Sequence, residues 1–440
     1  MTLRLTERPF GRCVFAMLFA ALMAPGSAQS ENSSNTTATP SAVVETYAHI
    51  AEATYQDAHT AALQLQEKIA ALIAVPSDAP LRAAREAWKA ARIPYMQSEV
   101  FRFGNAIVDD WEGKVNAWPL DEGLIDYVSG GYGADSPENE FYAANVVANP
   151  SIKIGGQTVD ASKITPDLLR DTLQEAGGVE ANVATGYHAV EFLLWGQDLN
   201  GTKPGAGART ATDYDLRNCT NGNCDRRAQY LTVVTQLLVD DLEWMAKQWG
   251  KDGSARLALL KDPNVSGLSA IFTGLGSLAY GELAGERMKL GLLVHDPEEE
   301  QDCFSDNTHN SHFYDALGMQ NVYLGSYKRL DGAVVSGPGI GELVKAKSAE
   351  ADGRARAALD ATMAKMAAMA ERSKMEAYDQ MIGEGNAEGN ATVQAAIDAL
   401  VGQAKEFERG VCVLGLKAIE FEGSDSLDDP AKVGTEENKG

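Results

Sequence analysis

The feature that most constrains the fold of this 440-residue chain is a series of long Ala-rich segments with apolar residues at helical spacing. The first runs from Ser41 to Ala74 and stops at Val75-Pro76, and later ones cover 213–249, 349–381 and 391–421. Apolar residues three and four positions apart form one face of an α-helix, whereas the alternation typical of a β-strand is scarce here. The sequence therefore predicts an all-α protein made of helical bundles.

One short pattern occurs twice in the chain. The two copies are GYHAVEF at 186–192 and GLKAIEF at 415–421, and an acidic stretch containing Gly follows both. These seven aligned positions predict an internal duplication. The first copy retains a metal-binding site, whereas the second copy has Lys417 in place of His188 and retains only the helix. Because single cores stop growing beyond about 250–300 residues, we expect two helical-bundle domains, 41–255 and 256–425.

The N-terminus has the organisation of a secretory signal peptide. Three arginines precede an apolar stretch, and small residues follow it up to Ala28, where cleavage is expected. Residues 29–40, rich in Ser, Asn and Thr, are expected to form a flexible leader, and 426–440 a disordered tail. Cys13 precedes the apolar stretch instead of standing at the cleavage point, which argues against a lipid anchor.

The hydropathy and the net charge of the sequence limit where the protein can reside and which partners it can bind. No later segment reaches the 18 or so uninterrupted apolar residues of a membrane span, so we expect a soluble periplasmic or secreted protein. The formal net charge is −24. Such a surface repels nucleic acid and anionic membranes and attracts cations.

Four cysteines follow the predicted cleavage point. An even number of cysteines in an exported chain predicts disulfides. Cys219 and Cys224 flank a tight turn that a disulfide can close, and Cys303 would then pair with Cys412. The alternative is a zinc site made by these thiols, which oxidising surroundings disfavour.

The first copy of the repeated pattern contains a possible metal-binding pair. In a helix, His188 and Glu191 lie on adjacent turns, with about 5–6 Å between their Cβ atoms. Imidazole and carboxylate ligands suit iron or zinc, and the missing ligands must come from distant segments. The alternative is a polar pair at a contact between helices.

A second polar group lies on the predicted helix that contains Trp88. Arg92, Tyr95, Glu99 and Arg102 are spaced to line one stripe, with apolar residues on the neighbouring faces. The stripe is either solvated or buried, and buried charges require partners.

Two other patterns are interpreted as ordinary structure. The acidic run from Asp296 to Asp302 lacks the Gly of a tight calcium-binding loop, so we expect a solvated loop. Met363, Met366 and Met369 form a helical stripe that suits copper(I) but is more typical of a core.

Five ordered blocks of the sequence together resemble the imelysin-like family, and its iron-regulated protein A type in particular. The blocks are ARIPYMQSEVFRFG (91–104), VNAWPLDEGLIDYV (115–128), GYHAVEFLLWG (186–196), YGELAGERM (280–288), and FSDNTHNSH with MQNVYLGSY (304–312 and 319–327). The GxHxxE signature of the family is matched at Gly186, His188 and Glu191.

The resemblance implies two bundles related by duplication, with a functional site near their interface around the GxHxxE helix. It places the Glu99 stripe beside that helix and brings His309 toward it from the second bundle; otherwise His309 is a surface residue. The residues then expected at the site are His188, Glu191, Glu99 and His309 as metal ligands, and Arg92, Tyr95, Arg102, Asp121, Ser305 and Asp306 as residues that orient the ligands or bind an anion.

Two functions follow from the resemblance and the residues. The first is an exported protein that binds iron or an iron chelate and serves iron uptake, with a membrane-bound transport component as partner. The second is a zinc-dependent peptidase with His188 and Glu191 as ligands, since the family takes its name from an insulin-cleaving protease. The chain has no HExxH motif, and a zinc site needs a third ligand and a separate base. Binding is therefore the favoured function.

Overall fold

The computed structural model describes residues 38–154 and 156–433. The predicted signal peptide and the predicted leader up to Thr37 lie outside the described residues. The described chain belongs to one compact unit that begins at Ala38.

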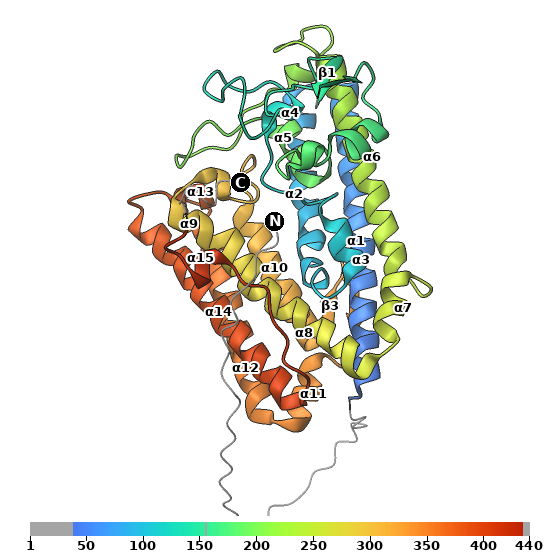
Figure 1. Cartoon of the computed structure of the whole chain (residues 1–440), viewed down its shortest axis with the longest axis vertical. Helices are drawn as coiled ribbons and strands as arrows, with labels where there is room; N and C mark the ends of the chain where they lie inside the picture. The colour runs from blue at the N-terminus through green and yellow to red at the C-terminus, as the bar shows by residue number, and fades with distance from the viewer. Residues whose placement is uncertain (1–37, 155, 434–440) are drawn as a thin grey trace, which may run out of the picture. The chain divides into compact units, whose positions relative to one another are not determined.

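This part of the chain is largely helical, which confirms the all-α prediction (Figure 1). The longer helices are α1 (Pro40–Ala74), α2 (Asp78–Met96), α5 (Gly186–Trp195), α6 (Cys224–Trp249), α8 (Leu268–Ser277), α10 (Thr308–Leu324), α12 (Ala349–Arg372) and α14 (Ala387–Leu414). The shorter ones are α3 (Ala106–Glu112), α4 (Glu122–Ile125), α7 (Ser254–Leu260), α9 (Leu290–Val294), α11 (Ile340–Lys347), α13 (Tyr378–Ile382) and α15 (Asp425–Asp428). None of the described helices is both long and apolar enough to cross a bilayer.

Short 3-10 helices, π-helices and two hairpins complete the described structure. The 3-10 helices are η1 (Glu99–Phe101), η3 (Ala176–Gly178), η4 (Ala211–Tyr214) and η7 (Pro297–Glu299), and the π-helices are η2 (Leu168–Leu173), η5 (Pro263–Gly267) and η6 (Leu278–Lys289). The antiparallel hairpins are β1 (Ser151–Ile154) with β2 (Gln157–Asp160), and β3 (Ser326–Lys328) with β4 (Val334–Ser336). Both hairpins are two-stranded, so the sheets do not form the core.

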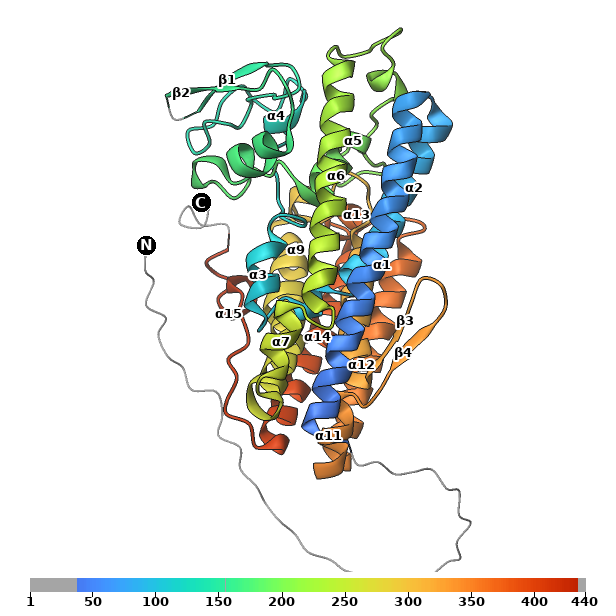
Figure 2. The same ribbon diagram turned by 90° about the vertical axis from the view of Figure 1, so that its right-hand side faces the viewer.

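Helices α1, α2, α5 and α6 pack together as a first group. α1 starts at Pro40, whose missing N–H is harmless in the first turn, and the Thr39 hydroxyl accepts a hydrogen bond from the Ala42 N–H. α6 runs alongside α1 (Figure 2). α5 contacts both α2 and α6, so the GxHxxE helix lies inside this group.

Helices α10, α12 and α14 pack with α8 and η6 as a second group, coloured yellow to red in Figure 1. The two groups meet where α2 contacts α10. The expected domain boundary between residues 255 and 256 falls inside α7, which itself contacts α1 and α6. The chain therefore does not pass from one group to the other through a linker at this point.

The second copy of the repeated pattern is not a helix, so the prediction that GLKAIEF forms one is wrong. α14 ends at Leu414, because Gly415 adopts a left-handed φ of +69°, and residues 416–424 have no regular structure. This segment runs along α8 and η6, where Phe421 covers Gly276 so closely that a Cβ there would lie 2.2 Å from its ring. The local match with 186–192 thus gives no structural support for a duplication.

Ordered structure extends beyond residue 426, where the disordered tail was expected to begin. The Ser424 hydroxyl caps α15 by accepting a hydrogen bond from the Ser426 N–H. The Tyr280 hydroxyl of η6 donates to Asp428 at 2.7 Å. These contacts fix α15 against η6, and residues 434–440 lie outside the described chain.

One predicted disulfide is present and the other is not. Cys219 and Cys224 are bonded, with their Cα atoms 5.9 Å apart, which confirms the first prediction. The prediction of a Cys303–Cys412 disulfide is wrong. Cys303 lines a small pocket in the turn after η7, whereas Cys412 is exposed in the last turn of α14, so the two thiols lie in different surroundings.

The GxHxxE helix begins at a position that only glycine fits. Gly186 has a left-handed φ of +83°, and a Cβ there would lie 2.5 Å from the backbone oxygen of Val115. The next residue, Tyr187, donates its backbone N–H to that same oxygen at 2.7 Å. Gly186 thus allows α5 to start in direct contact with the loop that follows α3.

We predict that Gly186→Ala lowers the free energy of unfolding by at least about 2 kcal/mol, since left-handed strain alone costs about 1–2 kcal/mol and the close contact adds to it. Gly402→Ala is the control, because Gly402 lies in the interior of α14 and its Cβ would meet nothing within 4 Å. It should stabilise the protein by roughly 0.5–1 kcal/mol. Denaturant unfolding measures both, and an unchanged stability of Gly186→Ala would contradict the prediction.

Candidate metal centre

α5 is buried along its whole length. The run Phe192-Leu193-Leu194-Trp195 makes the helix apolar on all sides, which is typical of a helix enclosed by others. At its first turn, the Trp88 indole N–H of α2 donates to the backbone oxygen of Tyr187 at 2.9 Å. The two polar side chains of the helix, His188 and Glu191, are thereby held in the interior of the protein.

Three side chains form a group that could hold a metal ion: His188 and Glu191 of α5, and Asp302 of the turn between η7 and α10. One ligand atom from each lies within 4.8 Å of the other two. The exposed fractions of the three side chains are 1%, 0% and 0%. The structure thus brings the GxHxxE pair together with a carboxylate more than 100 residues away in the sequence.

The His188 ring has one satisfied and one unsatisfied nitrogen. Its Nδ1 lies 2.9 Å from Glu191 Oε2, while its buried Nε2 has no hydrogen-bond partner among the described residues. The other oxygen of Glu191 accepts the backbone N–H of Ser305 at 3.0 Å. Buried polar atoms without partners are rare, and an ionised carboxylate and a neutral imidazole are both metal ligands. The donor set therefore fits a metal ion.

The protonation states of the three groups follow from burial and from Arg92. Burial and the Arg92 charge lower the pKa of His188 to about 3, so its imidazole is neutral and can donate a lone pair. Burial and the nearby Asp302 raise the pKa of Glu191 well above its usual value. Burial also acts to raise the pKa of Asp302, but Arg92 and the hydrogen bonds from Ser311 and Asn307 hold it below its usual value.

Arg92, which was expected to orient the ligands or to bind an anion, contacts Asp302 directly. Its guanidinium donates to Asp302 Oδ1 at 2.9 Å and to Asn116 Oδ1 at 2.5 Å. It also lies 5.1 Å from the ring centre of Tyr187 and 5.7 Å from that of Tyr95, distances at which cation–π attraction operates. Tyr95, expected near the site, is therefore part of the wall around Arg92.

Glu99 is buried, but it is not one of the three grouped ligands. Its Oε2 accepts a hydrogen bond from Arg287 of η6 at 2.6 Å, and Arg287 also pairs with Asp315. Asn116 Nδ2 donates to Glu99 at 3.5 Å, and the same amide accepts from Arg92. Glu99 thus reaches the centre only through Asn116 and Arg92, and its own charge is balanced by Arg287.

Arg102 lies apart from the three ligands. Its side chain is 24% exposed and pairs with Asp109, Glu112 and Glu282, all of which carry negative charge. The helical stripe that would have aligned it with Arg92 is broken, because α2 ends at Met96 and η1 follows. Arg102 therefore belongs to the ionic network of Glu282 and Arg287, which also contains Glu99.

The remaining predicted residues occupy three different positions. Ser305 is at the centre, through its backbone N–H on Glu191. Asp306 adopts a positive φ of 53° in the turn before α10, and His309 follows in the first turn of that helix; neither belongs to the grouped ligands. Asp121 accepts hydrogen bonds from Asn139 and Tyr132 in a loop of the first group.

Asp302 is the one candidate metal ligand of this group that was not predicted from the sequence. It ends the acidic run from Asp296, which was expected to be a solvated loop, but Glu300, Gln301 and Asp302 are buried. The prediction of a solvated loop is wrong for these three residues, because tertiary contacts bury the turn. The Trp118 indole N–H donates to the Glu300 backbone oxygen, and the Arg92 guanidinium binds the Asp302 carboxylate. The available signal was position, because Asp302 stands two residues before the FSDNTHNSH block, which begins at Phe304.

The comparison with known proteins agrees with this architecture. The sequence profile described as imelysin matches residues 51–407, and the chain therefore belongs to the imelysin family.

Among individual relatives, the iron-regulated protein A of Synechococcus elongatus is 36% identical over 67 residues, a stretch covering 15% of this chain and only 19% of that protein. A crystal structure assigned as an iron-regulated protein A precursor of Parabacteroides distasonis shares 17% identity, with a TM-score of 0.60 over 87% of this chain and 97% of that one. An imelysin-like protein from Psychrobacter arcticum shares 15% identity, with a TM-score of 0.52 over 86% and 97%. These two structures share the fold.

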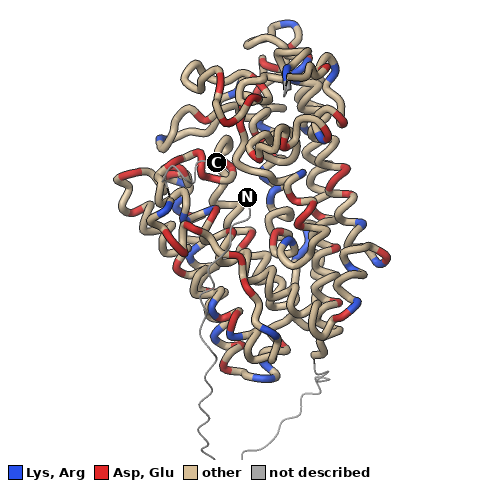
Figure 3. The backbone as a smooth tube through the Cα atoms, viewed as in Figure 1, with Lys and Arg blue, Asp and Glu red and all other residues tan. Residues whose placement is uncertain are grey.

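Further acidic side chains surround the candidate centre. Figure 3 shows acidic positions gathered around α13 and the neighbouring turns. Burial raises the pKa of Asp379 in α13 to about 7, and the negative charge of Asp306 adds to this effect. Burial likewise raises the pKa of Glu298 to about 7, helped by Glu122. The native state therefore holds protons on these carboxyl groups that an unfolded chain releases at lower pH.

We predict that Asp379 contributes stability to the metal-free protein that is lost as the pH rises from about 4 to about 7, so that the slope of stability against pH is more positive in Asp379→Asn than in the wild type. The native Asp379 binds its proton more tightly than the unfolded chain does, so its contribution declines across that window, by about 2–4 kcal/mol. Denaturant unfolding in chelator at several pH values gives the slope. Asp360→Asn, a change of an exposed Asp on α12, is the control and should keep the wild-type slope. A slope of stability against pH in Asp379→Asn equal to that of the wild type would refute the prediction.

Proposed function

We propose that the protein binds a metal ion, iron in the first place, at His188, Glu191 and Asp302, and that it serves bacterial iron uptake as an exported binding protein. The observation that carries the proposal is that His188, Glu191 and Asp302 are buried and each place one ligand atom within 4.8 Å of the other two. A cation held between these atoms is bound by all three side chains.

The donor set supports iron by chemistry and by charge. One imidazole and two carboxylates resemble the mixed nitrogen and oxygen ligation of non-haem iron sites. Two carboxylates also balance a divalent ion in the protein interior, where unpaired charge is costly. The names of the relatives from Synechococcus elongatus and Parabacteroides distasonis refer to iron regulation. The proposed partner is accordingly a membrane-bound component of iron transport.

Zinc-dependent peptide cleavage is the alternative, since the same three donors suit zinc. A peptidase needs its scissile bond next to the metal, but the side chains of His188 and Glu191 are 1% and 0% exposed. A small ion passes into such an interior more readily than a polypeptide segment does. Burial of the donors therefore favours ion binding over peptide cleavage.

We predict that His188→Ala abolishes specific binding of Fe²⁺, because it removes the imidazole donor and leaves Glu191 without its partner. The loss of affinity should exceed the 10–100-fold or so that follows the loss of an outer partner of a metal ligand. The control is His49→Ala, the same change at an exposed residue of α1. Anaerobic titration calorimetry measures both, and wild-type affinity in His188→Ala would rule out this centre.

We also predict that metal binding releases a proton and strengthens as the pH rises. Burial and the charge of Asp302 raise the pKa of Glu191 well above its usual value, so that in the metal-free state it keeps its proton to higher pH than a free carboxyl group, whereas burial lowers the pKa of His188 to about 3. A bound cation requires the ionised carboxylate, so the proton must leave. Calorimetric heats in buffers of different ionisation enthalpy report the released proton, and Glu191→Gln should release none. Heats that do not depend on the buffer in the wild type would contradict this assignment.

A further inference from the structure

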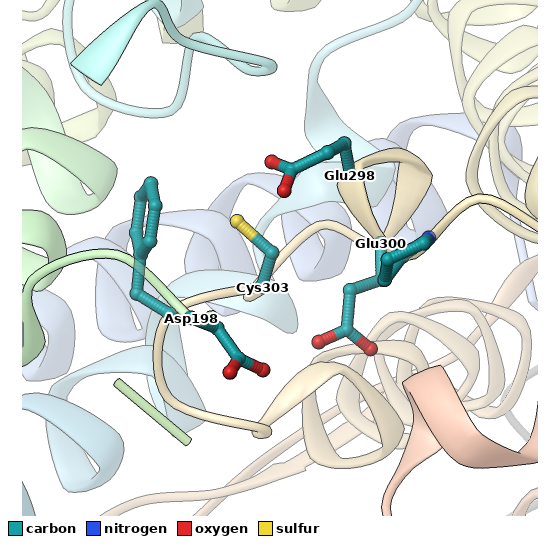
Figure 4. A pocket seen from close by; sticks show the side chains of 6 residues that line it. Asp198, Glu298, Glu300 and Cys303 are labelled. Carbon is teal, nitrogen blue, oxygen red and sulfur yellow. The ribbon is translucent and has the colours of Figure 1, made fainter. Parts of the chain in front are cut away.

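A small pocket of about 10 Å³, enough for about one water-sized sphere, adjoins the turn that carries Asp302 (Figure 4). It is lined by Asp198, Pro297, Glu298, Glu300, Cys303 and Phe304. Half of these side chains are carboxylates, and none is basic. The pocket therefore has room for one small ion, and its acidic side chains favour a positive charge.

Glu300 has a carboxylate for which the described protein provides no partner. The residue is 1% exposed, and neither of its carboxylate oxygens accepts a hydrogen bond from the described residues. The contact with Trp118 involves only the backbone oxygen of Glu300. A buried carboxylate without hydrogen bonds or a counter-charge is costly, and such a group calls for a ligand.

The surroundings of Glu300 add negative charge. Asp379 and Asp306 are near enough for their charges to act on Glu300. Both oxygens of Asp379 and Oδ1 of Asp306 are buried and also without hydrogen-bond partners in the described part of the chain. Among the described Lys and Arg side chains, none forms an ion pair within 4.0 Å of Glu300, Asp306 or Asp379. A cation at this place would supply the partner that these carboxyl oxygens lack.

We propose that this pocket is a second cation site, with Glu300 as its central ligand, and that it takes a hard divalent ion such as Mn²⁺. Carboxylate oxygens are the ligands that such ions prefer. Within the described chain, only His188, Glu191 and Asp302 place ligand atoms within 4.8 Å of one another. Glu298 and Asp198 therefore reach an ion bound to Glu300 by a small movement of their side chains.

The pocket and the candidate metal centre are separate sites on one turn. Cys303 and Phe304 face the pocket, while Asp302 before them and Ser305 after them contact the groups of the centre. Phe304 also packs against Phe192 of α5, with ring centres 5.3 Å apart. The two sites have no ligand in common, so the pocket can bind an ion whether or not iron binds at His188.

The test counts bound Mn²⁺ by the electron paramagnetic resonance of the free ion at equilibrium with the full mature chain. Glu300→Gln removes the charge and keeps the shape, and Glu299→Gln is the matched control, since Glu299 is the adjacent carboxylate and does not line the pocket. We expect Glu300→Gln to bind one Mn²⁺ fewer than its parent, and Glu299→Gln to bind as many as the parent.

The same pair of variants is made in the His188→Ala background, so that the two sites are tested separately. Loss of one Mn²⁺ on Glu300→Gln in either background supports the pocket site. Equal counts in Glu300→Gln and its parent, or equal losses in Glu300→Gln and Glu299→Gln, overturn it. If His188→Ala leaves the count unchanged while Glu300→Gln lowers it, the pocket site stands and Mn²⁺ binding at the His188 centre fails.

Discussion

The site depends on one buried ion pair, between Arg92 of α2 and Asp302 of the turn before α10. Their side chains are 1% and 0% exposed, and the N–O distance is 2.9 Å. The pair joins the first helix group to the second and holds Asp302 ionised beside His188. Breaking a buried pair by removing one partner typically costs about 3–5 kcal/mol, because the other charge is left unpaired. The geometry of the centre and part of the contact between the helix groups, which the Arg287–Glu99 pair also joins, thus rest on the same interaction.

Much of the fold was predictable because it follows from local chemistry. The spacing of apolar residues sufficed for α1, and a short turn between two cysteines sufficed for the Cys219–Cys224 disulfide. The segment 415–421 was mispredicted because its helical pattern is overridden by tertiary contacts: Gly415 ends α14, and Phe421 packs on Gly276. Sequence similarity over seven residues does not reveal which packing surface is available to each copy.

The candidate site was predictable only in part, for a related reason. His188 and Glu191 lie on one helical face, so their spacing alone indicated the pair. Asp302 stood in a run of charges that reads as solvated, and only the approach of Arg92 makes its burial favourable. Glu99 was misassigned because the helical stripe ends at Met96, and the change to η1 turns it toward Arg287. Such long-range charge pairing is not encoded in local spacing.

The most direct test of the account is the position of the metal itself. Crystals of the iron-loaded protein, measured on both sides of the iron absorption edge, give an anomalous difference map that locates iron independently of any variant. The account predicts a peak bonded to the His188 imidazole and to carboxylate oxygens of Glu191 and Asp302. An iron peak elsewhere, for example between Glu99 and Arg287 or in the Glu300 pocket alone, would contradict the central claim.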